Sequence, residues 1–474
     1  MPSATHIAEP RWTGAREVMQ LSWPIILGTF SYSVMDFADK LMVAQLGPIP
    51  LAAIGSAAVW SWTLGTIVFG IVTSAATFVA QSLGRGRPEV CACYAWQAIY
   101  VALLAFVVAA VLYPLAGYGF RLMNHEPAVT HLEVTYFRIR LLGYPGMAWV
   151  MGLGAFFQAV NHSRVPMYTA FFANACNIGL NYLLIFGKLG FPELGVAGAA
   201  TATVFAQWLQ AVLLTGIFLN AYYHREFGTR TAWRFDKGRT GELLRIGVPA
   251  GMSMFIDVAN WGVFISFVVG HFGAVALASN NVAVTFMHLS FMPAVGVSQG
   301  VAALVGQYIG AGDIPRAKAR TYTALRIACM YMAGMGLIFI LFGRPLTAAL
   351  FSDDPAVIDL ARWLLVLAGI FQVFDAVAII SMGALRGAGD TRWMMWATFF
   401  LAYLGFLPAA FVLAYVFEGG AFGAWVGATV YVVALSSLLF VRFRSERWRH
   451  INIFTAAMAQ TSGNSTPPAG RSVV

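Results

Sequence analysis

Four acidic residues lie inside long apolar stretches of the chain, whereas the other sixteen of its twenty Asp and Glu residues fall in loops, tails or the ends of such stretches. The four are Asp36, Asp39, Asp257 and Asp375. In a membrane-spanning helix, a charged Asp at the centre costs about 2.5–3.5 kcal/mol, so an acid kept there is a candidate for function. A carboxyl group away from water either takes a proton or stays ionised beside a cation. These residues therefore predict a site that binds protons or metal cations.

The sequence neighbours of these aspartates separate one of them from the rest. Lys40 follows Asp36 by four positions, so on a helix the two share a face and can neutralise each other. Asp39 is adjacent to Lys40, but residues at i and i+1 do not face each other. Asp257 and Asp375 have no cation within one turn. We expect Asp36 to form an ion pair and the other three aspartates to bind the cation.

Amide side chains add candidate ligands in the apolar stretch 166–186. Asn174, Asn177 and Asn181 are spaced three and four positions apart, which places them on one helix face. Their amide oxygens are acceptors of the kind that a hard cation such as sodium binds. The alternative is hydrogen bonding between helices, worth roughly 0.6 kcal/mol per bond. The sequence leaves both interpretations open.

Composition identifies the surroundings of these residues as a membrane. Apolar residues make up 59% of the 474 positions and charged residues 10%, whereas a soluble globular chain has roughly half and a quarter. Apolar runs of about 20 residues or more fit membrane-spanning α-helices and exclude the short alternating strands of a β-barrel. We predict an all-α integral membrane protein with about twelve transmembrane helices. The expected spans are 20–46, 51–80, 94–116, 134–155, 166–186, 194–221, 243–270, 277–309, 322–343, 358–382, 394–417 and 422–442.

The distribution of Lys and Arg predicts the orientation of the chain. With the N-terminus inside, nineteen of the 29 basic residues lie in cytoplasmic segments and only Arg121, Lys188 and Arg344 lie in outer loops. Both termini are therefore expected in the cytoplasm. This bias also accounts for the net charge of +9, so we expect no nucleic-acid partner.

A polar stretch near the middle of the chain, YYHREFGTRTAWRFDKGRTGE, divides the expected spans six and six. The first residues lack the short apolar core and cleavage site of a signal peptide. The expected organisation is a cytoplasmic leader at 1–19, an N-lobe at 20–221, a cytoplasmic linker at 222–242, a C-lobe at 243–442 and a cytoplasmic tail at 443–474.

The two halves repeat each other at a nearly constant offset. The repeated pairs are Gln81 and Gln307, Gly84 and Gly310, Gly86 and Gly312, and Gly47 and Gly273 at 226 positions, Pro24 and Pro249 at 225, and Arg164 and Arg392 at 228. Because each half has six spans, the two lobes share one orientation and are related by a pseudo-twofold axis along the membrane normal. Binding sites in such folds lie near the repeat interface at mid-depth.

The candidate ion-binding residues do not follow this repeat. The same offsets place Tyr32 opposite Asp257, Met147 opposite Asp375 and Phe264 opposite Asp39. The two lobes are therefore expected to hold different ion sites.

Two of the repeated residues are prolines inside expected spans. Pro24 and Pro249 each remove a backbone hydrogen bond from a helix, which permits a bend. They are candidate hinges, and a static kink is the alternative.

Four segments of the chain, in this order, resemble the multidrug and toxic compound extrusion (MATE) family of transporters, NorM branch. They are MDFADKLMVAQLGPIPLAAIG, CNIGLNYLLIFGKLGFPELGVAGAA, RIGVPAGMSMFIDV and FDAVAIISMGALRGAGDTR, within a resemblance that runs from Leu21 to Phe440. The resemblance implies a two-lobed bundle of twelve helices that alternates between inward- and outward-open states. It implies export of organic cations in exchange for Na⁺ or H⁺, without enzymatic activity, cofactor or metal other than Na⁺. It also implies a monomer in the bacterial inner membrane.

The resemblance also assigns roles to the candidate residues. Asp39 with Asn177 and Asn181 corresponds to the cation site of the N-lobe, and Asp257 with Asp375 to that of the C-lobe. The NorM branch usually has Glu where this chain has Asp257, so the carboxylate here reaches one methylene less far.

Two other functions are alternatives to export. A flippase for lipid-linked precursors would line its cavity with several Arg or Lys for pyrophosphate, whereas the clearest interior cation in the sequence is Lys40. An integral membrane enzyme would need paired His and Glu or a nucleophile with a base, and no span offers them. The chain also encodes no phosphate-binding loop for ATP, because its only Gly-Lys pair, Gly187-Lys188, is followed by Leu189. Sodium and protons both bind carboxylates, so the sequence does not separate them.

Overall fold

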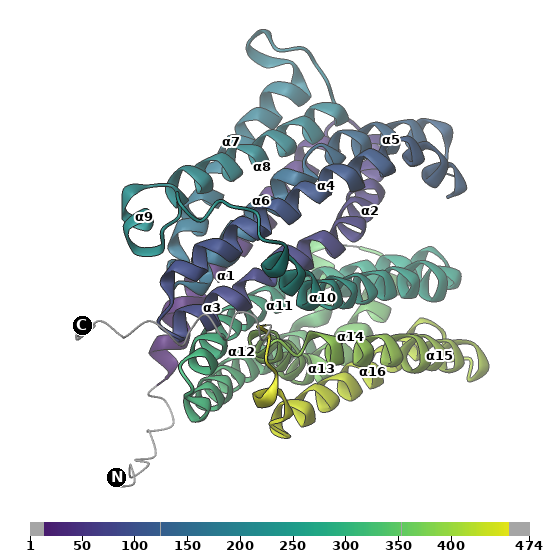
Figure 1. Cartoon of the computed structure of the whole chain (residues 1–474). Helices are drawn as coiled ribbons and strands as arrows, with labels where there is room; N and C mark the ends of the chain where they lie inside the picture. Colours follow the sequence, from purple (N-terminus) through teal and green to yellow (C-terminus); the bar gives the residue numbers. More distant parts are fainter. Residues whose placement is uncertain (1–13, 124, 352, 455–474) are drawn as a thin grey trace.

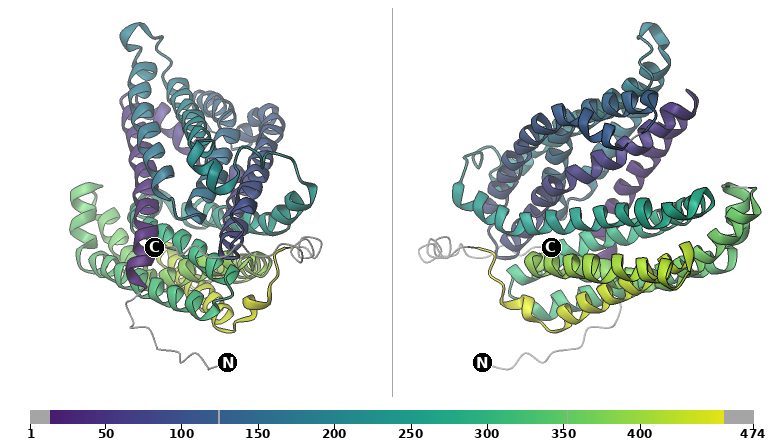
Figure 2. Two further views of the ribbon diagram at one scale, coloured as in Figure 1. Left: turned by 60° about the vertical axis from the view of Figure 1, so that its left-hand side comes forward. Right: turned by 90° about the vertical axis from the view of Figure 1, so that its right-hand side faces the viewer.

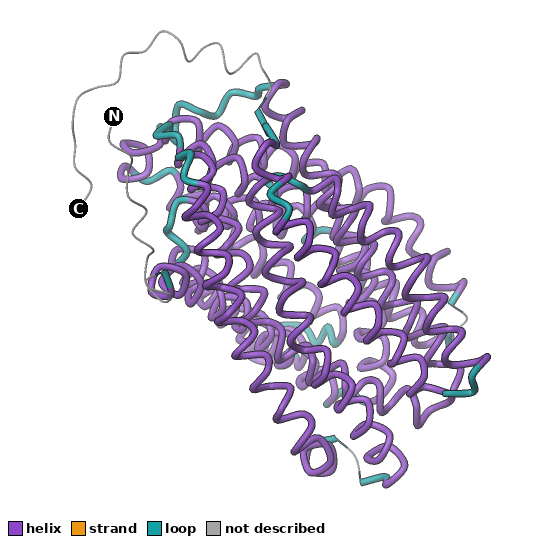
Figure 3. Tube along the Cα trace, turned by 90° about the horizontal axis from the view of Figure 1, so that it is seen from below, coloured by secondary structure: helices purple, strands orange, loops and turns teal. Residues whose placement is uncertain are grey.

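A computed structural model describes residues 14–123, 125–351 and 353–454 of the chain. The first thirteen residues of the expected leader and residues 455–474 of the expected tail lie outside this part. The described residues form helices joined by short turns and contain no strand (Figure 3).

The helices fall into two sequential sets. In the first half they are α1 (Ala15–Ala44), α2 (Pro48–Thr73), α3 (Ala75–Gly84), α4 (Pro88–Leu122), α5 (Pro127–Leu141), α6 (Tyr144–Ala159), α7 (Arg164–Phe186) and α8 (Val196–Phe218). The short helix α9 (Ala221–Phe227) follows. In the second half they are α10 (Lys237–Val263), α11 (Gly273–Gly310), α12 (Ile314–Leu350), α13 (Pro355–Ala388), α14 (Thr391–Phe400), α15 (Leu407–Phe411) and α16 (Gly420–Arg444). Short 3₁₀ or π segments include η2 (Phe264–Val269), η4 (Leu401–Phe406) and η6 (Arg447–His450).

These helices are consistent with the twelve expected spans. Within the described residues, nine helical stretches are long and apolar enough to cross a membrane, and the longest, Lys237–Gly310 with 74 residues, contains two spans. Two further spans fall below that standard. The helix α1 carries three charged residues near its end, and the next pair, α5 and α6, is interrupted at Leu142 and Gly143. The protein is all-helical, as predicted.

Helix starts follow from residues that supply or spare backbone hydrogen bonds. Asp313 accepts from the Arg316 N–H at 3.0 Å, and Asp354 accepts from the Ala356 N–H at 2.9 Å, so each caps donors that the first helical turn leaves unpaired. Pro88 and Pro355 lie at first helical positions, where their missing N–H costs nothing.

Each half has its own apolar core, and Figure 1 shows the two halves as separate layers of helices. The first core contains the buried rings of Phe78, Tyr94 and Phe156, and the second contains those of Phe371 and Trp425. Three helix pairs connect the layers: α1 packs against α7 of its own half and α11 of the other, α10 packs against α14 of its own half and α2 of the other, and α3 packs against α11.

The two halves meet at the end of the molecule where α1 begins, and they diverge toward the opposite end (Figures 1 and 2). At the meeting end, which we call the closed end, Gln81 of α3 donates to the Gly387 carbonyl at 3.1 Å. Gln307 of α11 donates to the Ala159 carbonyl at 2.7 Å. Each glutamine therefore binds the backbone of the opposite half.

These two contacts are copies of each other under the internal repeat. Gln81 and Gln307 are 226 positions apart, and their acceptors Ala159 and Gly387 are 228 apart, the same offset as Arg164 and Arg392. The glycines three residues after each glutamine explain the close approach. A Cβ on Gly84 would overlap the Gln307 carbonyl oxygen, and one on Gly310 would overlap that of Gln81. The repeated Gln-x-x-Gly segments thus cross each other at the interface.

Charged and aromatic side chains add to the closed end. Glu17 of α1 accepts from the Tyr308 hydroxyl at 2.6 Å and from Arg320 Nε at 2.5 Å, which joins α1 to α11 and α12. Tyr94 of α4 donates to Glu242 of α10 at 2.5 Å. The closed end is therefore held by specific polar bonds as well as by glycine packing.

We predict that Gln81→Ala destabilises the protein by about 1–3 kcal/mol, because it leaves the buried Gly387 carbonyl without its donor. The melting temperature of purified protein measures this effect. Gln20→Ala is the matched control, since Gln20 is an exposed glutamine of α1 near the closed end. Equal melting temperatures for the two variants would show that the crossing does not depend on this bond.

Candidate functional site

Asp39 is held by side chains from two other helices of the first half. Its side chain is 8% exposed. Asn181 of α7 donates to Asp39 Oδ1, and the Thr203 hydroxyl of α8 donates to Oδ2 at 3.2 Å. Both carboxylate oxygens therefore have protein donors, and no ion-pair partner of Asp39 is found in the described part of the chain.

Asn177 extends this cluster along α7. Its Oδ1 accepts from Asn181 Nδ2 at 3.1 Å, and its Nδ2 donates to Thr203 at 3.4 Å. Asn181 Oδ1 is buried and has no hydrogen-bond partner among the described residues. Asn174 belongs to a different contact, because it donates to the Ser31 hydroxyl at 2.7 Å. The structure thus brings together Asp39, Asn177 and Asn181, whose role in binding a cation stays a prediction.

Sequence reasoning did not identify Thr203 as part of this cluster. A signal was present, because Thr203, Gln207 and Gln210 are spaced four and three positions apart and share one face of α8. That face meets α1 again at Gln210, which accepts from the Tyr32 hydroxyl at 2.5 Å. A polar stripe on an otherwise apolar helix was the available clue.

Asp257 and Asp375 form the second acidic site, between α10 and α13. The two carboxylates lie close enough to repel each other when both are charged. Asp257 accepts from the Tyr431 hydroxyl of α16 at 3.5 Å. Asp375 has no hydrogen-bond or ion-pair partner within the residues that the structure describes. The structure therefore brings these two predicted residues together, and their role stays a prediction as well.

Tyr431 and Arg386 are the residues of this second site that the sequence did not reveal. The Tyr431 ring stacks on Phe406 of the π segment η4 with centroids 4.8 Å apart, which holds its hydroxyl beside Asp257. Arg386 of α13 acts electrostatically on Asp257 but forms no ion pair with it. Neither residue stands out in an apolar span by spacing alone.

Asp36 and Lys40 form the ion pair that their i, i+4 spacing predicts, with Nζ and Oδ2 2.6 Å apart. Their side chains are 57% and 47% exposed. The interpretation of Lys40 as the clearest interior cation is wrong, because Lys40 is half exposed and paired. Among the described residues, buried guanidinium Nε atoms belong instead to Arg140, Arg239 and Arg386.

The two candidate hinge prolines lie within continuous helices. Pro24 is inside α1 and Pro249 inside α10. The glycines that flank Pro249, Gly247 and Gly251, pack directly on the α2 backbone. Their role as hinges stays a prediction.

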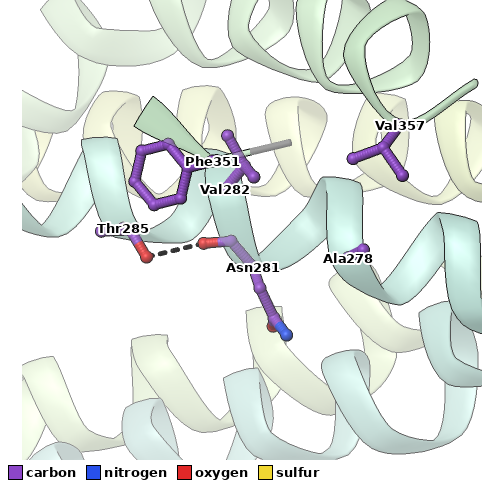
Figure 4. Close-up of a pocket in the computed structure, with 6 residues that line it drawn as sticks. All are labelled: Ala278, Asn281, Val282, Thr285, Phe351 and Val357. Atoms are coloured by element: carbon purple, nitrogen blue, oxygen red, sulfur yellow. Dashed lines mark hydrogen bonds between the residues drawn. The ribbon is translucent and has the colours of Figure 1, made fainter. Parts of the chain in front are cut away.

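A shallow pocket lies between α11, the residue that follows α12 and the start of α13 (Figure 4). It is lined by Ala278, Asn281, Val282, Thr285, Phe351 and Val357. Thr285 donates to the Asn281 carbonyl at 2.7 Å, so its hydroxyl is occupied within the helix. Val357 lies about five helical turns from Asp375 on α13, so this pocket is separate from the second acidic site.

Comparison with known proteins gives consistent results. The sequence model of the MatE family matches residues 24–183 and 249–411. The probable multidrug resistance protein NorM of Thermotoga maritima is 27% identical over 454 residues, which cover 94% of this chain and 96% of that protein.

Solved structures show the same fold. The eukaryotic MATE transporter AtDTX14 aligns with a TM-score of 0.82 and 20% identity, over 93% of this chain and 97% of that one. The Vibrio cholerae MATE transporter VcmN in its bent form aligns with a TM-score of 0.81 and 18% identity, over 94% and 99%.

We predict that Asp36→Asn changes stability by less than about 1 kcal/mol, because half-exposed ion pairs contribute little. The ion dependence of transport should remain that of the wild type, since Lys40 already neutralises Asp36. Melting temperature and transport at graded ion concentrations measure the two effects. A clear shift in ion dependence at unchanged stability would place Asp36 among the cation-binding residues.

Proposed function

The chain belongs to the MatE family, and from this premise we propose that it is a secondary active antiporter, which exports organic cations in exchange for Na⁺ or H⁺. Members of this family are transporters and not enzymes. The observation that carries the proposal is that Asp39, Asp257 and Asp375 lie within spans and have no ion-pair partner among the described residues. A cation from solution supplies the missing charge at each site.

The first acidic site has ligands that suit sodium as well as a proton. Sodium is a hard cation and binds oxygen atoms. The cluster offers the Asp39 carboxylate, the Thr203 hydroxyl and the buried Asn181 Oδ1, which otherwise lacks a partner. A bound sodium ion would satisfy that oxygen and reorient the Asn181 amide, whereas a proton would need only the carboxylate.

The second acidic site works by the proximity of two carboxylates. Like charges disfavour joint ionisation, so a neighbouring pair tends to hold one proton or one cation between them. Tyr431 donates to Asp257 and not to Asp375, so the two members of the pair differ. We assign Asp375 as the member that exchanges its cation during transport.

Alternating access accounts for the shape of the molecule. The distribution of basic residues favours a cytoplasmic closed end, and with this proposed orientation the structure corresponds to a state that faces outward. A cation that enters from outside neutralises the acidic site within each lobe. The closed end then opens through rupture of the Gln81 and Gln307 contacts. We further propose that the protein acts as a monomer in the bacterial inner membrane.

The structure gives no support to the flippase alternative. Such a protein needs cations that are free to bind pyrophosphate. Arg386 acts electrostatically on Asp257, and Arg140 acts electrostatically on Asp39, so these two buried guanidinium groups already interact with an acid.

Uptake of ethidium into inverted membrane vesicles, which corresponds to export from the cell, tests the proposal. A sodium gradient alone and then a proton gradient alone should reveal one ion that drives transport. Vesicles without the protein provide the background rate. Transport that neither gradient accelerates would contradict an antiport mechanism.

We predict that Asp375→Asn abolishes ion-driven efflux while the protein still folds, because the change preserves size and removes only the charge that the cation requires. Asp359→Asn is the matched control: Asp359 lies on the same helix, but it is exposed and 3.3 Å from Arg344. Efflux rate and melting temperature should be measured for both variants. Wild-type efflux in Asp375→Asn would exclude Asp375 from coupling.

A further inference from the structure

A break between α5 and α6 places an arginine inside the first half. The helix is interrupted at Leu142 and Gly143, and Arg140 lies just before the break. The two helices together form one span, so Arg140 is near its middle. A cation at this depth is expensive, and such residues usually have a functional partner.

Gln207 of α8 holds Arg140 at this break. One orientation of the Gln207 side-chain amide gives both its oxygen and its nitrogen a partner. In that orientation the oxygen accepts from Arg140 Nη1 at 3.3 Å, and the nitrogen donates to the Gly143 carbonyl at 3.3 Å. Gly143 leaves room for this arrangement, because a Cβ there would overlap the end of the Gln207 side chain. The break, the glycine and the glutamine together form a seat for one guanidinium group.

The seat faces the Asp39 cluster. Gln207 follows Thr203 by one helical turn, and Thr203 donates to Asp39. Tyr136, one turn before Arg140 on α5, is within electrostatic reach of both Arg140 and Asp39. Arg140 forms no ion pair with Asp39, so a separation remains between the two charges.

Among the described residues, Arg140 is the cation that acts on Asp39, and the neighbouring basic residues have other partners. Lys40 is adjacent in sequence but is bound to Asp36 at 2.6 Å. Arg138 is on the same helix as Arg140 but points to α4, where its Nε donates to the Tyr113 carbonyl at 3.3 Å and its guanidinium lies 5.1 Å from the Tyr113 ring centroid.

We propose that Arg140 is a resident counter-charge for Asp39, which stabilises the empty, ionised site and weakens the binding of the coupling cation there. The inference rests on the proposed function, because it requires that Asp39 binds the coupling ion. A direct ion pair between Arg140 and Asp39 would exclude the coupling cation. A positive charge at a distance only lowers the affinity of Asp39 for that cation. The ion can then leave the site on the other side of the membrane.

The expected effect is about tenfold in the dissociation constant. A tenfold change corresponds to about 1.4 kcal/mol. Two unit charges about 12 Å apart interact by this amount at an effective dielectric constant of about 20, so contact is unnecessary.

Ion binding to purified protein tests the proposal, with NaCl titrated at alkaline pH and acid titrated separately in sodium-free buffer. The signal that Asp39→Asn removes defines binding at Asp39. Arg140→Gln should bind that ion with an about tenfold lower dissociation constant. Arg138→Gln, which removes the same charge from the same helix, should match the wild type. Arg140→Lys keeps the charge and should remain close to the wild type.

Three results would overturn the inference. The first is an equal dissociation constant in wild type, Arg140→Gln and Arg138→Gln, while Asp39→Asn still abolishes the signal. This result would leave the proposed function intact. The second is tighter binding in both Arg140→Gln and Arg140→Lys, which would assign the effect to the lost Gln207 contact instead of charge. The third is wild-type binding of both ions in Asp39→Asn, which removes Asp39 from the proposed function as well.

A failure of Arg140→Gln to fold is also informative. The inference then expects the double variant Asp39→Asn, Arg140→Gln to fold, because both charges of the pair are gone. A double variant that remains unfolded would show that Arg140 has a structural role unrelated to Asp39.

Discussion

The close crossing of two Gln-x-x-Gly segments at the closed end is the contact on which the arrangement of the two halves depends. Gly84 and Gly310 let the backbones approach, and each glutamine then reaches a carbonyl of the opposite half. Because the repeat supplies this contact twice, two equivalent hydrogen bonds join the halves at this end. A few hydrogen bonds of modest net strength can hold the lobes and still break during a transport cycle.

The acidic residues within the spans differ in how their negative charges are compensated. Each carboxylate must be compensated, and the chain uses a different means each time. Asp36 has a direct ion pair, Asp39 has neutral donors with a more distant guanidinium, and Asp375 shares its site with a second acid. In the proposed mechanism a mobile cation neutralises the charge that the last two arrangements leave, whereas Lys40 already neutralises the first.

Much of this organisation was predictable from the sequence, because it depends on local spacing. The i, i+4 spacing gave the Asp36 and Lys40 pair, and the constant offset of the repeat marked Gln81 and Gln307 before their contact was known. The seat of Arg140 was not predictable, since it depends on a helix break and on Gln207, which is 67 positions away in sequence. Tyr431 likewise reaches Asp257 only through stacking on Phe406. Contacts between distant helices require the tertiary structure.

In an antiporter, movement of an organic cation and movement of Na⁺ or H⁺ are obligatorily linked. The most direct test is to load proteoliposomes with ethidium, impose no ion gradient, and measure ion movement as ethidium leaves. We expect the coupling ion to move in the opposite direction and Asp375→Asn to abolish both fluxes. Ethidium that equilibrates through the wild-type protein with no accompanying ion movement would contradict antiport.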